Sequence, residues 1–148
     1  VRPGPLETAR ELGATPVRAD GEDPAARIRE ATGGKGVDVA VEVAGRPETV
    51  RASLRSLAPR GRLALVGIFS GAVEVEPYAE VIRREAELVG VSDHQLAEIP
   101  DLLAWAERGA LRLEPVVRRT VPLEAGAVNE VLDRLEAFEA DGRTVIVP

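Results

Sequence analysis

The chain has 148 residues and a formal net charge of −6, with 45% hydrophobic and 30% charged residues. This balance is typical of one globular domain with a real core, and it excludes a disordered chain. Lys and Arg are nowhere concentrated, so no nucleic-acid partner is expected; Arg83–Arg84 and Arg118–Arg119 are short pairs predicted on solvated faces. No apolar run approaches the ~20 residues that span a bilayer, and no secretory pattern opens the chain, which predicts a cytoplasmic protein without a membrane partner.

Residue types that are rare or absent limit the possible chemistry. Cysteine is absent, which excludes disulfides, thiolate nucleophiles and cysteine-bound zinc within the chain. His94 is the single histidine, so a His-rich metal site and a Ser-His-Asp triad lack support, and we expect His94 in an exposed loop. The absence of Met indicates either a fragment or a start codon not read as Met. Scarcity of Asn, Gln and Met fits a thermophile, although a GC-rich genome would have the same effect.

Glycine, proline and hydrophobic periodicity divide the chain into alternating helices and strands. Asp23 is the expected N-cap of a helix whose first residue is Pro24. The glycine-bounded run at 37–44 predicts a strand buried on both faces. In chain order the predicted elements are a helix at 6–12, an extended piece at 15–19, a helix at 25–32, a strand at 37–44, a helix at 47–57, a break at 59–61, a strand at 62–68, a helix at 77–85, a strand at 87–91, a helix at 98–109, an extended piece at 115–121, a helix at 123–140 and a strand at 144–147. This alternation predicts an α/β fold with a doubly wound parallel sheet.

Several phrases, in this order, resemble the coenzyme domain of the medium-chain dehydrogenase family, which includes zinc-type alcohol dehydrogenases and quinone reductases. They are ARELGAT (Ala9–Thr15), ATGGKGVDVAVEVAG (Ala31–Gly45), LAPRGRLALVG (Leu57–Gly67), RGALRLEPVVRRTVPLEAGAVNEVLDRL (Arg108–Leu135) and DGRTVIVP (Asp141–Pro148). The resemblance implies that residues 1–148 are a partial Rossmann-like nucleotide-binding domain. It implies that the first two strands, the Gly-rich turn and the N-terminal catalytic barrel domain are absent. The clustered glycines at 33–36 lie between a helix and a strand, so they are not the phosphate-binding fingerprint.

Ligands of doubly wound sheets bind outside the carboxyl ends of the strands. That rule selects three groups of residues, to which the resemblance adds backbone roles and Arg143 as a ligand of the coenzyme pyrophosphate. The predicted coenzyme-binding residues are Val43, Ala44, Gly45, Arg46, Val66, Gly67, Ile68, Val91, Asp93 and Arg143. The resemblance places the first four beside the adenosine half and Val66 to Ile68 under the nicotinamide, with Arg2 a hint toward NADP.

Each of these positions also has a purely structural interpretation. Gly45 can be a strand-end turn, Arg46 a solvated residue, Val66 and Ile68 sheet core, and Arg143 a surface residue paired to Asp141 or Glu139. Glu42, inside a strand, is expected to be a partnered structural carboxylate, because burying an unpaired charge is costly. We expect no catalytic residue and no metal ligand within the chain.

The resemblance implies a portion of an oxidoreductase that transfers hydride between NAD or NADP and an alcohol, aldehyde or ketone. Zinc, if used, would be bound in the absent domain, because zinc-free quinone reductases share this region; the chain alone would be inactive and would bind no coenzyme tighter than millimolar. The alternative is a truncated, inactive remnant that self-associates. We expect a dimer through sheet edges. In the isolated chain this is the strand 37–43, and in the intact family it is the last sheet strand with its neighbour around 70–75, where residues 72–76 alternate as in an edge strand.

Overall fold

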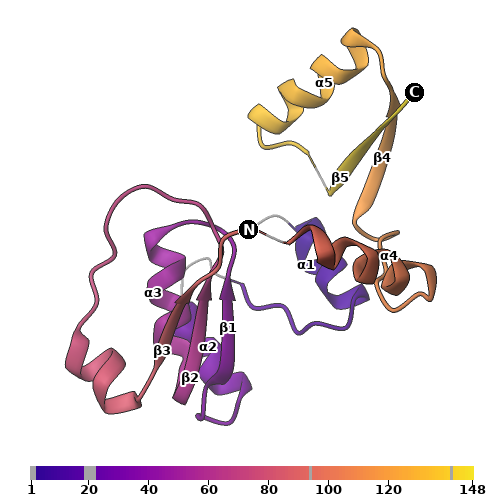
Figure 1. The fold of residues 1–148 in the computed structure, drawn as a ribbon. Helices are drawn as coiled ribbons and strands as arrows, with labels where there is room; N and C mark the ends of the chain where they lie inside the picture. The colour runs from indigo at the N-terminus through magenta and orange to yellow at the C-terminus, as the bar shows by residue number, and fades with distance from the viewer. Residues whose placement is uncertain (1–2, 19–22, 94, 141) are drawn as a thin grey trace. The chain divides into compact units, whose positions relative to one another are not determined.

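The computed structural model describes residues 3–18, 23–93, 95–140 and 142–148, and Arg2, His94 and Asp141 lie outside these ranges. The chain divides into two compact units (Figure 1). One unit comprises residues 17–94, and the other comprises residues 1–16 together with 95–148. None of the helices in the described ranges is long and apolar enough to cross a membrane.

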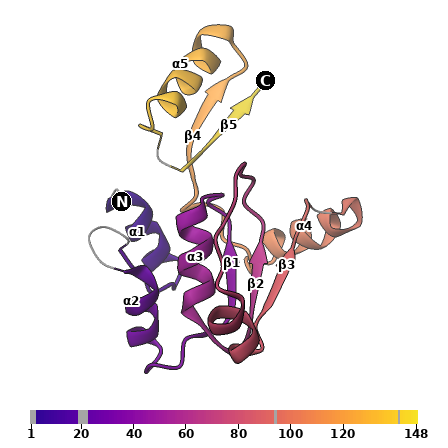
Figure 2. The same ribbon diagram turned by 90° about the vertical axis from the view of Figure 1, so that its left-hand side faces the viewer.

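The unit of residues 17–94 contains a three-stranded parallel sheet in the order β1-β2-β3. Helix α3 lies along one face of this sheet with α2 beside it, as Figures 1 and 2 both show. The elements are α2 (Pro24–Ala31), β1 (Val37–Glu42), α3 (Pro47–Ser56), β2 (Leu57–Leu65), the short turns η1 (Pro77–Val81) and η2 (Ile82–Arg84), and β3 (Glu87–Gly90). The predicted alternation and the parallel pairing are therefore confirmed.

Leucine and valine side chains from α3 and β2 form the core of this unit. Val50 and Leu54 are four residues apart, so they project from the same side of α3, where they meet Leu57 and Leu63 of β2. All four side chains are buried. At the start of α2, the Asp23 carboxylate accepts a hydrogen bond from the Ala25 N–H (3.1 Å), which confirms the predicted N-cap.

The predicted break at 59–61 lies inside β2 instead of before it. Val37 pairs with Leu57 but Val39 pairs with Arg62, so a bulge absorbs the intervening residues. Arg60 has a φ of 62° in this bulge. A proline and a positive-φ residue are thus accommodated without ending the strand.

Strand β1 is not buried on both faces, which corrects the expectation from its apolar sequence. Ala40 and Glu42 face α3, but Val39 and Val41 on the opposite face are each 60% exposed. Within the described residues, β1 is hydrogen-bonded only to β2 and is an edge strand. An apolar run therefore predicted the strand correctly but not what surrounds it.

The alternating segment at 72–76 forms no strand within the described chain, so the edge strand predicted there is wrong. Val73 and Val75 pack against the core while Glu74 and Glu76 are exposed. The alternation of apolar and acidic residues therefore reflects how an extended loop packs against the core, and within the described chain this loop is not part of a sheet. The predicted extended piece at 15–19 likewise forms no strand in its described residues.

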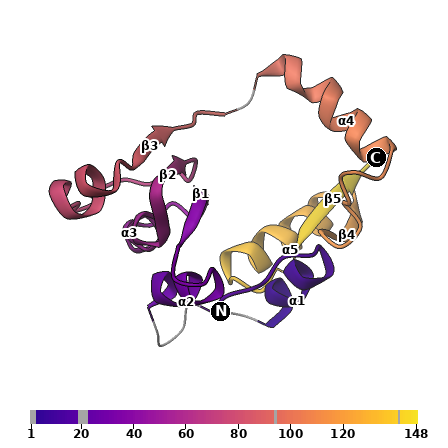
Figure 3. The same ribbon diagram turned by 90° about the horizontal axis from the view of Figure 1, so that it is seen from below.

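The second unit contains a two-stranded parallel sheet of its own, β4-β5. Figure 3 shows α5 beside these strands. Its elements are α1 (Pro3–Glu11), η3 (Leu96–Glu98), α4 (Ile99–Glu107), β4 (Val117–Pro122), α5 (Ala125–Glu136) and β5 (Arg143–Val147). Helix α5 is shorter than predicted, because Phe138 adopts a φ of 57° just after it.

Candidate functional site

The carboxyl ends of β1, β2 and β3 lie next to one another, because the strands are parallel and Glu42, Leu65 and Gly90 are in register. Beyond this row the chain continues through residues 43–46, 66–68 and 91–93, the three predicted coenzyme-binding groups. The Val66 and Gly67 N–H groups each donate to the Glu42 carbonyl at 2.9 Å, and the Val91 N–H donates to the Leu65 carbonyl at 2.9 Å. The structure thus brings the three groups together at one sheet edge.

The Glu42 carboxylate organises the end of β1. It is 3% exposed, and its Oε1 accepts hydrogen bonds from the N–H groups of Ala44 (2.9 Å) and Gly45 (3.0 Å) and from the Thr49 hydroxyl (2.6 Å). These donors satisfy the buried charge, so the expected role of a partnered structural glutamate is confirmed. Among the described residues, no Lys or Arg pairs with it.

Thr49 is the member of this arrangement that sequence reasoning missed. It lies in the first turn of α3, three residues after Arg46, whose carbonyl it also approaches (2.8 Å). A threonine early in a helix is common, and only the fold brings its hydroxyl to a carboxylate seven residues earlier. The sequence therefore held no signal that would single it out.

Two glycines allow the ends of β1 and β2 to touch through their backbones. A Cβ on Gly67 would lie 2.3 Å from the Gly45 nitrogen, and a Cβ on Gly45 would lie 2.4 Å from the Ile68 oxygen. Gly45 also has a φ of 66°, which disfavours other residues. This contact by itself requires glycine at both positions, so their presence does not depend on a bound coenzyme.

Apolar side chains at this edge remain open to solvent. Ile68 is 99% exposed and Val43 is 69% exposed, while Val66 and Val91 are partly exposed. The interpretation of Ile68 as sheet core is therefore wrong. Exposed aliphatic side chains at the ends of the strands form a surface against which a flat ring can lie.

The remaining predicted residues differ in their surroundings. Ala44 and the Arg46 side chain are exposed, and Arg46 is the N-cap residue of α3 without a side-chain cap hydrogen bond. Asp93 has a φ of 55°. Arg143 belongs to the other unit, where it begins β5 and its N–H donates to the Val116 carbonyl (2.7 Å).

The residues of this edge fit the ring of a nicotinamide coenzyme better than they fit a metal. The small residues and exposed aliphatic side chains at these strand ends offer an apolar surface and no cluster of charged ligands. In the described ranges, no group of three or more His, Cys, Asp or Glu side chains is placed to hold a metal ion. No zinc ligand is therefore assigned here.

Known proteins have sequences and folds similar to those of this chain. A family model described as zinc-binding dehydrogenase matches residues 1–108. An NAD-dependent alcohol dehydrogenase of Sulfurisphaera tokodaii is 33% identical over 150 residues, which cover 100% of this chain and 42% of that protein. An L-threonine 3-dehydrogenase of Symbiobacterium thermophilum is 28% identical over 146 residues, covering 97% of this chain and 41% of that protein.

Solved structures of dehydrogenases also resemble this chain. The 2R,3R-butanediol dehydrogenase of Bacillus subtilis superimposes with a TM-score of 0.88 at 26% identity, covering 100% of this chain and 42% of that one. The alcohol dehydrogenase of the hyperthermophilic archaeon Aeropyrum pernix gives 0.81 at 32% identity, covering 100% and 41%. The chain therefore spans about 42% of the length of such relatives.

The matched part is the coenzyme domain of these relatives, with its Rossmann-like parallel sheet. The resemblance drawn from the sequence phrases is confirmed. The chain belongs to the zinc-binding dehydrogenase family and corresponds to the coenzyme-domain portion of a zinc-type alcohol dehydrogenase-like protein.

Proposed function

We propose that the chain serves an NAD-linked oxidoreductase that transfers hydride between the coenzyme and an alcohol, aldehyde or ketone. The supporting observation is the edge at the carboxyl ends of β1–β3, where Glu42 holds the backbone and exposed aliphatic side chains line the surface. Relatives that match the full length of this chain are named NAD-dependent alcohol dehydrogenases, which favours NAD over NADP.

In this proposal the coenzyme supplies the hydride chemistry, and the chain binds and orients its rings. The backbone at 43–46 faces the adenosine half, and the backbone at 66–68 and 91–93 faces the nicotinamide half. Glu42 acts indirectly, because it holds the N–H groups of Ala44 and Gly45 in place. Arg143 would bind the pyrophosphate with its planar guanidinium.

Titrating ¹⁵N-labelled chain with NADH, followed by NMR, tests this placement. We expect millimolar binding, with shifts at the amides of 43–46, 66–68 and 91–93. Ile68→Asp should abolish the shifts without unfolding the chain, since Ile68 is 99% exposed. Ile82→Asp, at an exposed position in η2, which precedes the amino end of β3, is the control. Shifts elsewhere, or no shift at any soluble NADH concentration, would contradict the proposal.

A second candidate function, a self-associating inactive module, is favoured by the open edge of β1. Val39 and Val41 are each 60% exposed, and unpaired strand edges recruit other strands. We expect the isolated chain to sediment as a dimer or larger species at micromolar concentration. Val41→Lys should restore the monomer, whereas Leu96→Lys should not. If the unsubstituted chain sediments as a monodisperse monomer, this candidate is contradicted.

The reading frame upstream of Val1 distinguishes the two candidates. An in-frame Gly-rich fingerprint preceded by Cys and His zinc ligands favours the enzyme. The proposal places the enzyme in the cytoplasm, where nicotinamide coenzymes are available, and as a dimer. A thermophilic source is part of it, supported by the scarcity of Asn and Gln and the absence of Met.

A further inference from the structure

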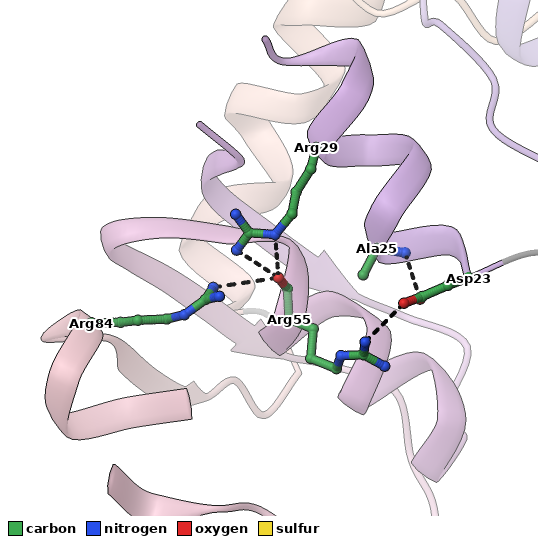
Figure 4. Close-up of polar contacts among 5 residues, drawn as sticks. All are labelled: Asp23, Ala25, Arg29, Arg55 and Arg84. Carbon is green, nitrogen blue, oxygen red and sulfur yellow. Dashed lines mark hydrogen bonds and ion pairs between the residues drawn. The ribbon is translucent and has the colours of Figure 1, made fainter. Parts of the chain in front are cut away.

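Two arginines converge on the C-terminal end of α3. Arg29 of α2 donates from Nε and Nη2 to the Arg55 carbonyl (3.0 and 2.8 Å) and from Nη2 to the Leu57 carbonyl (2.9 Å). Arg84 of η2 donates from Nη1 to the Leu57 carbonyl (2.9 Å). The same Nη1 lies 3.4 Å from the Arg55 carbonyl, where Arg29 and Arg84 meet in Figure 4. The Arg55 carbonyl lies in the last turn of α3, where carbonyls lack helical partners and carry the negative end of the helix dipole, so both cations stabilise the helix end.

The expectation of a solvated face is therefore wrong for Arg84, which is half-buried and bound to backbone. It holds for Arg83, which is exposed and makes no hydrogen bond or ion pair with the described chain. The Nε and Nη2 atoms of Arg84 likewise make no hydrogen bond among the described residues. One planar edge of Arg84 and the whole of Arg83 thus remain available as donors.

Arg83 and Arg84 line a cavity of about 350 Å³, together with Arg29 and Arg55. Three carboxylates also line it, but two of them already accept hydrogen bonds. Asp23 binds the Ala25 N–H and the Arg55 guanidinium (2.9 Å), and Glu80 accepts from the Glu76 N–H (2.9 Å). Four cations and three anions leave the lining with a net charge of +1.

The positive charges crowd one another around Arg84. Burial lowers the pKa of its guanidinium, and the charges of Arg29 and Arg83 lower it further. An anion in the cavity would offset this repulsion. A guanidinium edge with two adjacent N–H donors matches two oxygens of a phosphate or sulfate.

We propose that this cavity binds a small multivalent oxyanion of the phosphate class, held by Arg83 and by the Nε–Nη2 edge of Arg84. The site differs from the proposed coenzyme edge. It lies where α3 ends and β2 begins, whereas the coenzyme edge lies beyond the carboxyl end of β2, which spans nine residues. Either could therefore exist without the other.

Calorimetric titration of the 148-residue chain with inorganic phosphate tests the site, with chloride at equal ionic strength as the comparison. Arg83→Gln removes one charged donor without disturbing a described contact, so phosphate affinity should fall about tenfold. Arg10→Gln, at an exposed arginine of the other unit, removes the same charge and should leave the affinity unchanged.

NMR signals of the arginine Nε–H groups locate the ion. We expect phosphate, but not chloride, to shift those of Arg83 and Arg84. The proposal is overturned by absent binding, by equal losses in both variants, or by shifts centred on a different cavity, such as the one of about 200 Å³ lined by Arg118, Arg119 and Arg134. Ribose 5-phosphate in a parallel titration identifies the source. If ribose 5-phosphate binds more tightly than inorganic phosphate, the natural ligand of the proposed site is a sugar phosphate. If the two bind equally, the ligand is the free ion.

Discussion

Glu42 offers a sharp test of how the coenzyme edge is held together. Replacing it by glutamine keeps the shape of the side chain and removes the charge. The three donors at Oε1, from Ala44, Gly45 and Thr49, could still bind the amide oxygen. The amide NH₂ would replace Oε2, which lies 3.3 Å from the Gly45 nitrogen, so two donors would face each other.

The expected loss follows from the strength of the three hydrogen bonds. A bond to a charged group contributes about 1.5–3 kcal/mol and a neutral one about 1 kcal/mol, so neutralising Glu42 loses roughly 1 kcal/mol per bond. Burying an amide costs less than burying a carboxylate, which offsets part of this loss. We therefore expect Glu42→Gln to lower the free energy of unfolding by about 2 kcal/mol, or Tm by roughly 4–8 °C.

Urea denaturation followed by circular dichroism measures the global effect, and hydrogen exchange at the Ala44 and Gly45 amides measures the local one. Glu30→Gln is the matched control, because Glu30 is exposed on α2 and should change stability by less than about 0.5 kcal/mol. Thr49→Val should be non-additive with Glu42→Gln, because the two side chains are in contact. A Glu42→Gln chain as stable as the control, with unchanged amide protection, would refute the reasoning.

Three further substitutions test packing and charge. Gly67→Ala should destabilise the chain by about 1–3 kcal/mol in urea, because its Cβ meets backbone at 2.3 Å, whereas Gly90→Ala, with nothing within 4 Å, should be neutral. Leu54→Ala, in the core, should lose about 2–5 kcal/mol in the same assay, and a smaller loss would mean that the core collapses around the gap. A hydrogen bond from Arg119 and its charge lower the pKa of Glu130. The stabilisation by this pair is therefore present above the unfolded-state pKa of Glu130 and is lost as pH falls through its folded-state pKa. In Arg119→Gln, the pKa of Glu130 measured by NMR titration should rise toward the ordinary glutamate value. An unchanged titration midpoint would contradict this.

The sequence predicted individual elements well where residues nearby in the chain determine the local structure. The N-cap at Asp23 needed only the next two residues, and Val50 and Leu54 needed only the helical repeat. The segment at 72–76 failed because alternation reports which side chains point inward, whereas a strand also needs a hydrogen-bonded partner. The partner strand has to come from outside this five-residue segment.

The candidate site divides in the same way. Its three backbone groups were predicted because strand ends in a parallel sheet must meet at one edge. The Glu42–Thr49 hydrogen bond and the contact between Gly45 and Gly67 were beyond prediction, since they depend on how β1, α3 and β2 are placed in space.

The amino-acid sequence by itself determined the order of helices and strands, their parallel pairing and the family, because periodicity, caps and ordered phrases are local properties. Only the tertiary structure decided which apolar residues are covered. Val39, Val41 and Ile68 lie in apolar segments typical of a sheet core, yet their side chains are exposed. Burial depends on what packs against a face of the sheet and not only on the residues that form that face.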